Sequence, residues 1–164
     1  SYRRQYGSDF ISAMPTNLYG PGDNYHIKNS HVIPAIIFKA HEAKVKNRNF
    51  LTIWGTGKPK REFLFVDDLA DACTYLLENY SDEMPVNIGS GEEIEIGELA
   101  NLICKVVGFS GKIKFDKTQP DGTPRKILDT TKLNNLGWKF KTSLEEGLQI
   151  TYKSFLKNFL QLRQ

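Results

Sequence analysis

Apolar residues recur along this chain at the three- and four-residue spacing that places them on one face of a helix. The spacing predicts a first helix over residues 31–45, a second that begins with Asp67 or Asp68 as its cap, and a third that ends at Gly108. It also predicts a short helix over residues 130–136 and a last helix that begins at the capping box Ser143–Glu146. The expected apolar face of the second helix consists of Leu69, Ala72, Cys73, Leu76, Leu77 and Tyr80, and that of the last of Leu148, Tyr152, Phe155, Leu156 and Phe159.

Short apolar or alternating runs lie between these helices and predict strands. The first run, Phe10–Met14, is expected to be buried and to end at Pro15, because proline has no backbone N–H to donate. Strands and helices that alternate so closely predict one α/β unit rather than two independent domains. The remaining predicted strands are Leu51–Trp54, Arg61–Val66, Pro85–Ile88 and Lys112–Phe115.

In the stretch from Pro15 to Pro34, about fifteen residues show neither the spacing of a helix nor the alternation of a strand. A loop of that length in a compact domain is usually functional or disordered. It contains Tyr19 and Tyr25 and ends at a predicted helix start, with Ser30 as N-cap and His31 in the first turn. Ligands of open α/β sheets bind just beyond the carboxyl ends of strands. We therefore interpret the stretch as a ligand loop, with an ordinary surface connection as the alternative.

Composition is that of a soluble globular protein, with 164 residues, 40% hydrophobic and 25% charged. No apolar run reaches the roughly 18 residues that span a bilayer, and no secretory signal is present. The net charge of +3 suits an anionic small ligand and gives little support for nucleic acid. Cys73 and Cys104 fall in helical patterns and are expected to be small buried hydrophobes, which fits a reducing cytoplasm. Because Ser1–Gly7 resembles the end of a helix, we expect a fragment of a longer protein.

Several polar residues could carry chemistry. His31, at the positive end of a helix dipole, suits an acid or a donor to an anionic ligand, or else a capping or core histidine. Lys39 follows it by two turns. Trp54 and Arg61 flank a Gly-Thr-Gly turn and suit a flat base or sugar beside a phosphate; a hydrophobic plug and a surface charge are the alternative.

The loop around residues 119–125 adds further charges. Asp121, Arg125 and Lys126 could converge on a diphosphate or could face water. The chain has no Gly-rich dinucleotide fingerprint, no Tyr-x-x-x-Lys pair, no Walker motif and no nucleophile elbow. It also has no metal-ligand spacing, so no metal site is expected.

Longer motifs carry a resemblance to a known family. The segments are Pro15–Pro21, Asn29–Pro34, Trp54–Leu69, Val86–Gly91, Asp121–Lys126, Asp129–Leu133, Leu136–Trp138 and Ser143–Leu148. Together they resemble the GDP-L-fucose synthase family of extended short-chain dehydrogenase/reductases. Arg61–Asp68 and Asn87–Gly91 occur across the extended short-chain enzymes that act on nucleotide sugars. Asn29–Pro34 and Asp121–Lys126 are more specific to the fucose synthase branch.

The resemblance implies a fold and a reaction. It implies the remnant of a Rossmann-type parallel sheet in residues 1–30, and a small mixed α/β domain that binds a GDP-sugar in residues 31–164, some of whose segments return to the first domain. The family converts GDP-4-keto-6-deoxy-D-mannose to GDP-L-fucose by 3,5-epimerisation and NADPH-dependent reduction at C4.

The resemblance also implies roles for single residues. Its NADP site falls on Pro15, Thr16, Asn17, Leu18 and His31, and its acid on His31. Its substrate contacts fall on Lys39, Trp54, Arg61, Asp121 and Lys126. Position 39 is lysine where some family members carry arginine, which keeps the charge without the bidentate geometry.

The family's Gly-rich fingerprint, catalytic Ser, Tyr-x-x-x-Lys and epimerisation Cys lie before the start of this chain. We therefore expect the C-terminal part of such an enzyme, cytoplasmic, and inactive as a separate piece. The family's homodimer is built mainly from helices of the absent half. The alternatives are a sister nucleotide-sugar epimerase or dehydratase, and a non-catalytic module that binds a nucleotide sugar.

Overall fold

The computed structural model describes residues 1–26 and 29–161. Helices and strands alternate along it, which confirms the α/β class. Within these ranges no helix is long and apolar enough to cross a membrane. The elements are α1 (Tyr2–Tyr6), β1 (Ala13–Pro15), β2 (Asn17–Tyr19), α2 (Val32–Val45), β3 (Phe50–Trp54), β4 (Lys60–Phe65), α3 (Val66–Asn79), β5 (Val86–Ile88), β6 (Glu93–Glu95), α4 (Ile96–Val107), β7 (Lys112–Asp116), β8 (Arg125–Lys126), α5 (Thr131–Asn135) and α6 (Leu144–Gln161).

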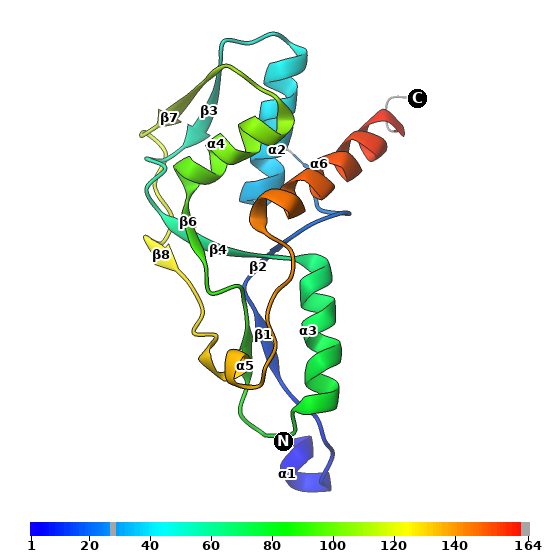
Figure 1. Cartoon of the computed structure of the whole chain (residues 1–164). Helices are drawn as coiled ribbons and strands as arrows, with labels where there is room; N and C mark the ends of the chain where they lie inside the picture. Colours follow the sequence, from blue (N-terminus) through cyan, green and yellow to red (C-terminus); the bar gives the residue numbers. More distant parts are fainter. Residues whose placement is uncertain (27–28, 162–164) are drawn as a thin grey trace.

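The parallel pair β2–β4 lies in the middle of the molecule, with one hydrophobic core on each side (Figure 1). Successive side chains of a strand point to opposite faces. Phe63 and Phe65 therefore pack into one core together with Tyr19, whereas Leu64 packs into the other, beside Leu18. As a result, the C-terminal part of β4 is buried on both faces.

The upper core in Figure 1 lies among α2, α4, α6 and the parallel pair β3–β7. Helix α4 shows how the sequence builds it, because Leu99, Ile103 and Val107 share one face and are at most 1% exposed. A capping box between Glu95 and Glu98 starts this helix, and Gly108 ends it in the left-handed conformation. The predicted stop at Gly108 is confirmed, whereas the sequence pattern does not predict the capping box.

The lower core joins α3 and α5 to the parallel pair β1–β5 (Figure 1). Strand β4 also pairs with β6 in the antiparallel sense and with β8 in the parallel sense. Segments far apart in the sequence therefore meet beside β4, at the junction between the cores. The buried residues of the lower core are Leu64, Ala72, Leu76, Val86, Ile88, Leu133 and Trp138.

Helix α3 differs from its predicted form at its start. It begins at Val66 with Phe65 at the N-cap position, so the prediction of Asp67 or Asp68 as the cap is wrong. Both aspartates lie in the first turn, where negative charge complements the helix dipole. The Asp68 carboxylate instead accepts hydrogen bonds from the backbone N–H groups of residues 141 and 142, at 3.3 and 3.0 Å. It thereby fastens the connection between α5 and α6.

The apolar stripe of α3 is narrower than its spacing predicts. Ala72 and Leu76 are buried, but Leu77 is 76% exposed and Cys73 is exposed. The prediction of a buried Cys73 is therefore wrong, whereas Cys104 is buried as expected. Periodicity marks the apolar side of a helix, but the neighbouring elements decide how much of that side is covered.

Helix α6 starts close to its predicted position. The Ser143 hydroxyl accepts a hydrogen bond from the Glu146 backbone N–H at 3.3 Å, which is one half of the expected capping box. Leu148 and Phe155 are buried on the predicted face. Phe159, expected on the same face, lies outside the described side chains.

The N-terminal strand is shorter and less buried than predicted. Strand β1 covers only Ala13–Pro15, while Phe10 is 64% and Met14 56% exposed. Pro15 is the last residue of β1 rather than its stop, which is tolerated because β1 pairs with β5 alone among the described strands. Strand β2 lies within the stretch that the sequence presents as loop.

We expect β1 to be the weakest strand of this chain in isolation. It offers an open edge and exposed apolar side chains, both of which favour association. In hydrogen exchange on the 164-residue chain, Ala13 and Met14 should exchange about tenfold or more faster than Ile103 in α4. Sedimentation should show self-association. Strong protection of residues 10–14 in a monodisperse monomer would contradict this.

Candidate active site

A cleft with a volume of about 1030 Å³ opens at the carboxyl end of β2. Its walls are the loop after β2, the N-terminal half of α2, the end of β3, the start of β4, and residues 120–122. This size suits a nucleotide or nucleotide-sugar ligand. The predicted site residues that line it are Thr16, Asn17, Leu18, His31, Lys39, Trp54, Arg61 and Asp121.

Two predicted site residues do not belong to the cleft lining. Pro15 ends β1, where it is in register with Ile88 of β5. Lys126 lies in β8, in register with Arg61 of β4, and is exposed. Of the lysines and arginines expected to converge on one ligand, the cleft therefore brings together Lys39 and Arg61 but not Lys126.

His31 is the N-cap residue of α2, one position before the first helical turn. The prediction of Ser30 as the cap is therefore wrong by one residue. His31 is exposed, its backbone is extended with ψ of 172°, and its side chain forms no capping hydrogen bond within the described residues. An imidazole at the rim of the cleft can thus turn toward a ligand, beside the positive end of the helix dipole.

Asp23 lines the same cleft as His31. Its Oδ1 accepts a hydrogen bond from the Asn24 backbone N–H at 2.7 Å. Burial raises the pKa of Asp23, and two smaller effects oppose that rise, the hydrogen bond from the Asn24 N–H and the charge interaction with His31. The loop after β2 therefore places a carboxylate in the electrostatic field of His31. The sequence did not single out this aspartate.

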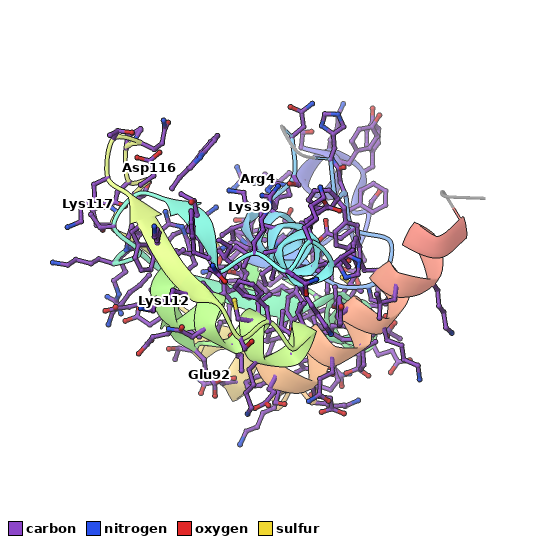
Figure 2. All side chains as sticks on the ribbon, turned by 90° about the horizontal axis from the view of Figure 1, so that it is seen from above. Arg4, Lys39, Glu92, Lys112, Asp116 and Lys117 are labelled. Carbon is purple, nitrogen blue, oxygen red and sulfur yellow. The ribbon has the colours of Figure 1, made fainter. Side chains whose placement is uncertain are left out.

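Lys39 and Trp54 form the wall between α2 and β3. Viewed from above, Lys39 lies on the side of α2 opposite to α4 and α6 (Figure 2). Its Nζ donates to the Thr52 carbonyl at 3.2 Å and lies 5.4 Å from the centre of the Trp54 ring. Burial lowers the pKa of Lys39. Trp54 is 67% exposed, so the plug interpretation is wrong and its ring is open to stack on a planar group.

Arg61 enters the cleft from β4. Its Nη1 donates to the Lys60 carbonyl at 2.7 Å. Its Nη2 lies so close to Gly122 that a Cβ there would be only 3.0 Å away. The glycine of the Asp-Gly-Thr-Pro-Arg-Lys motif therefore leaves room for the guanidinium, a group with five donors suited to phosphate oxygens.

Asp121 shapes the cleft by holding a turn. Its carboxylate accepts hydrogen bonds from the backbone N–H and the hydroxyl of Thr56, at 2.8 and 2.6 Å. Gly55 has a φ of 79°, and a Cβ there would overlap the same carboxylate. The aspartate thus fixes the turn between Trp54 and Arg61, a contact that the sequence pattern did not reveal.

The Asp121 contact should break in acid. The two Thr56 hydrogen bonds lower the pKa of Asp121, so the contact stabilises the fold above the ordinary aspartate pKa of about 3.9 and is lost as pH falls through the lower folded value. An NMR titration of the Thr56 amide should show a midpoint below about 3.9. The step should vanish in Asp121→Asn. A midpoint at or above the ordinary value would show that the contact is absent.

Glu62, next to the cleft, is a second residue that the sequence pattern does not single out. It stands between Arg61 and Phe63 in β4 and is fully buried. Its backbone carbonyl accepts hydrogen bonds from the side chains of Asn17 and Thr16, at 2.8 and 3.4 Å. A signal was present, because a carboxylate directly before the apolar run Phe63–Phe65 of a buried strand must find partners if it is buried with that run.

Parallel strands with a ligand-sized cleft beyond their carboxyl ends are typical of α/β enzymes that bind nucleotides. The sequence matches the NAD dependent epimerase/dehydratase family over residues 1–89, and the chain belongs to that family. Similar curated proteins are GDP-L-fucose synthase of Sinorhizobium fredii, 56% identical, and GDP-L-fucose synthase 1 of Arabidopsis thaliana, 59% identical. Each match covers 96% of this chain, and the chain spans about half the length of these relatives.

Solved structures agree with this assignment. A GDP-L-fucose synthetase from Naegleria fowleri bound to NADP superimposes with a TM-score of 0.87 at 32% identity, over 94% of this chain and 49% of that one. The UDP-glucose 4-epimerase of Thermotoga maritima gives a TM-score of 0.81 at 28% identity, over 96% of this chain and 49% of that one. These matches confirm the expected fold, with part of a Rossmann-type parallel sheet, and the expected resemblance to GDP-L-fucose synthases.

Proposed function

We propose that this chain is the C-terminal part of a GDP-L-fucose synthase, an enzyme that epimerises GDP-4-keto-6-deoxy-D-mannose at C3 and C5 and reduces it at C4. The observation that carries the proposal is that four of the predicted site residues line one cleft. It collects His31, Lys39, Trp54 and Arg61 from the N-cap of α2, its second turn, β3 and β4. The identity to GDP-L-fucose synthases over nearly the whole chain supports the same function.

The substrate end of the cleft would recognise the nucleotide diphosphate. Lys39 and Arg61 place two positive groups in one concave surface, which favours a diphosphate. The open ring of Trp54 offers a stacking face for the guanine or the sugar. Lys126 would contribute a positive charge from outside this lining, next to Arg61. Asp121 would support substrate binding indirectly, by holding the Gly55–Gly57 turn.

The other end of the cleft would hold NADP. Thr16, Asn17 and Leu18 line it. The side chains of Thr16 and Asn17 donate to the Glu62 carbonyl, and Leu18 lies in the β2–β4 ladder, so the three would present a fixed edge to a flat cofactor ring. Pro15 precedes them at the end of β1 and sets their start. When bound, NADPH supplies the hydride for C4. His31, which lines the same cleft at the N-cap of α2, would donate the proton that completes epimerisation.

The remaining expectations belong to the same proposal. Residues 1–30 would form the last segments of the NADP-binding domain, and residues 31–164 mainly the GDP-sugar-binding domain, with segments that return to the first. The longer protein would be a cytoplasmic, multifunctional homodimer. This chain alone would be inactive, because the cleft as described contains no Tyr-x-x-x-Lys pair to work on the C4 carbonyl.

The test is an activity assay on the longer protein that contains this chain. With GDP-4-keto-6-deoxy-D-mannose and NADPH, we expect GDP-L-fucose as the product, identified by chromatography against a standard. The 164-residue chain should give none. Release of a different sugar, or turnover only with a UDP-sugar, would favour a sister epimerase. Binding of GDP-sugar without any turnover by the longer protein would favour a non-catalytic module.

A further inference from the structure

Glu62 lies where the two cores meet. It shares its face of β4 with Leu64 of the lower core, whereas its sequence neighbours Arg61 and Phe63 face the cleft and the upper core. It is 0% exposed. A carboxylate at such a position costs free energy unless each oxygen finds a donor.

Both carboxylate oxygens are satisfied by backbone groups. Oε1 accepts from the Gly91 N–H at 2.7 Å, and Oε2 from the Leu128 N–H at 2.9 Å. A Cβ at Gly89 would overlap the carboxylate, so glycine is required for this close approach. No ion pair of Glu62 is found within the described part of the chain.

The backbone of the same residue holds the cofactor end of the cleft. Its carbonyl accepts hydrogen bonds from Asn17 Nδ2 and Thr16 Oγ1. Arg61, at the substrate end, is its immediate neighbour in β4. Glu62 therefore joins three segments of the chain. Its backbone carbonyl holds residues 16 and 17 at the start of β2, and its carboxylate holds the turn after β5 and the connection after β8.

We propose that Glu62 is a positioning residue, which sets the Thr16–Asn17 edge of the cleft at a fixed distance from Arg61. This inference rests on the proposed function for its kinetic consequence. Hydride transfer needs the cofactor and the sugar in near-contact geometry, and a small misplacement lowers turnover without removing either binding contact. A role in folding alone would instead lower stability and binding together.

The variant that separates these roles is Glu62→Gln. Glutamine keeps the size of the side chain but offers one acceptor and one NH₂ group, which then faces a backbone N–H. In the longer enzyme, kcat should fall by about tenfold, while KM for the GDP-sugar and Kd for NADPH stay within about twofold. Glu93→Gln is the matched control, because Glu93 on β6 pairs with Arg125 at 2.6 Å outside the cleft lining. It should leave kcat unchanged.

Hydrogen exchange on the 164-residue chain gives a second readout that needs no activity. In Glu62→Gln, exchange should rise by about tenfold at the Asn17 side-chain amide, which donates to the Glu62 carbonyl, as well as at the Gly91 and Leu128 backbone amides, with the α4 amides unchanged. A rise confined to Gly91 and Leu128 would overturn the proposal, as would wild-type kcat. A parallel loss of kcat, NADPH affinity and melting temperature would assign Glu62 to folding alone. If the wild-type longer protein has no fucose synthase activity, the proposed function fails and exchange alone decides this inference.

Discussion

Replacing His31 by glutamine in the longer enzyme should lower the rate of epimerisation by about 10²–10⁴-fold, the usual contribution of a general acid. Glutamine keeps a polar side chain at the N-cap of α2 but has no ionisable proton to donate. His31 forms no capping hydrogen bond in the described structure, so the helix should tolerate the change. The measurement is deuterium incorporation at C3 and C5 of the sugar from D₂O, followed by NMR or mass spectrometry.

His26→Gln provides a matched control for this experiment. His26 belongs to the same loop and is exposed, but it is not among the residues that line the cleft. Its replacement should leave both deuterium incorporation and NADPH binding at wild-type levels. Unchanged incorporation in His31→Gln would remove His31 from the role of acid. A loss of NADPH binding in parallel with the rate would make it a cofactor contact instead.

Replacing Arg61 by alanine should weaken GDP binding in the longer enzyme by about one to two orders of magnitude. A hydrogen bond between a guanidinium and a phosphate contributes roughly 1.5–3 kcal/mol, and about 1.4 kcal/mol corresponds to a factor of ten. The guanidinium lies in the cleft against Gly122, where the described structure gives it only one hydrogen bond, to the Lys60 carbonyl. Isothermal titration calorimetry with GDP measures the change directly.

Arg125→Ala removes the same charge a short distance away. Arg125 lies on β8, bonds Glu93 at 2.6 Å and is not part of the cleft lining. It should change GDP affinity by less than about threefold, because exposed pairs contribute about 0–1 kcal/mol. Equal affinities in Arg61→Ala and wild type would place the diphosphate elsewhere. Equal losses in both variants would indicate a general effect of net charge.

The helices were the most predictable part of the fold. A run such as Leu99, Ile103 and Val107 followed by Gly108 carries its period, its buried face and its stop within a dozen residues. Predictions that depended on neighbouring elements failed. Leu77 fits the period of α3 yet faces away from the core. Phe10 is exposed, because only Ala13 and Met14 of the predicted strand Phe10–Met14 pair with another strand, as part of β1.

Most residues of the cleft were predictable from the sequence, but the contacts that hold them in place were not. The motifs of the resemblance named His31, Lys39, Trp54 and Arg61, and the tertiary structure places all of them in one concavity. Lys126 was named by the same motifs, but its strand β8 runs beside β4 and leaves it outside the lining. Which residues face one space depends on strand register, and register is set by pairings between distant segments.

The sequence by itself determined the α/β class, the positions of the helices and the types of residue available to the cleft, because these depend on local spacing and side-chain chemistry. Only the tertiary structure decided that Asp121 holds the Thr56 turn and that Glu62 joins the two cores. Both carboxylates find their donors on segments far along the chain. A polar group that is buried, or that holds a turn in place, requires hydrogen-bond partners, but the residues next to it in the sequence do not identify those partners.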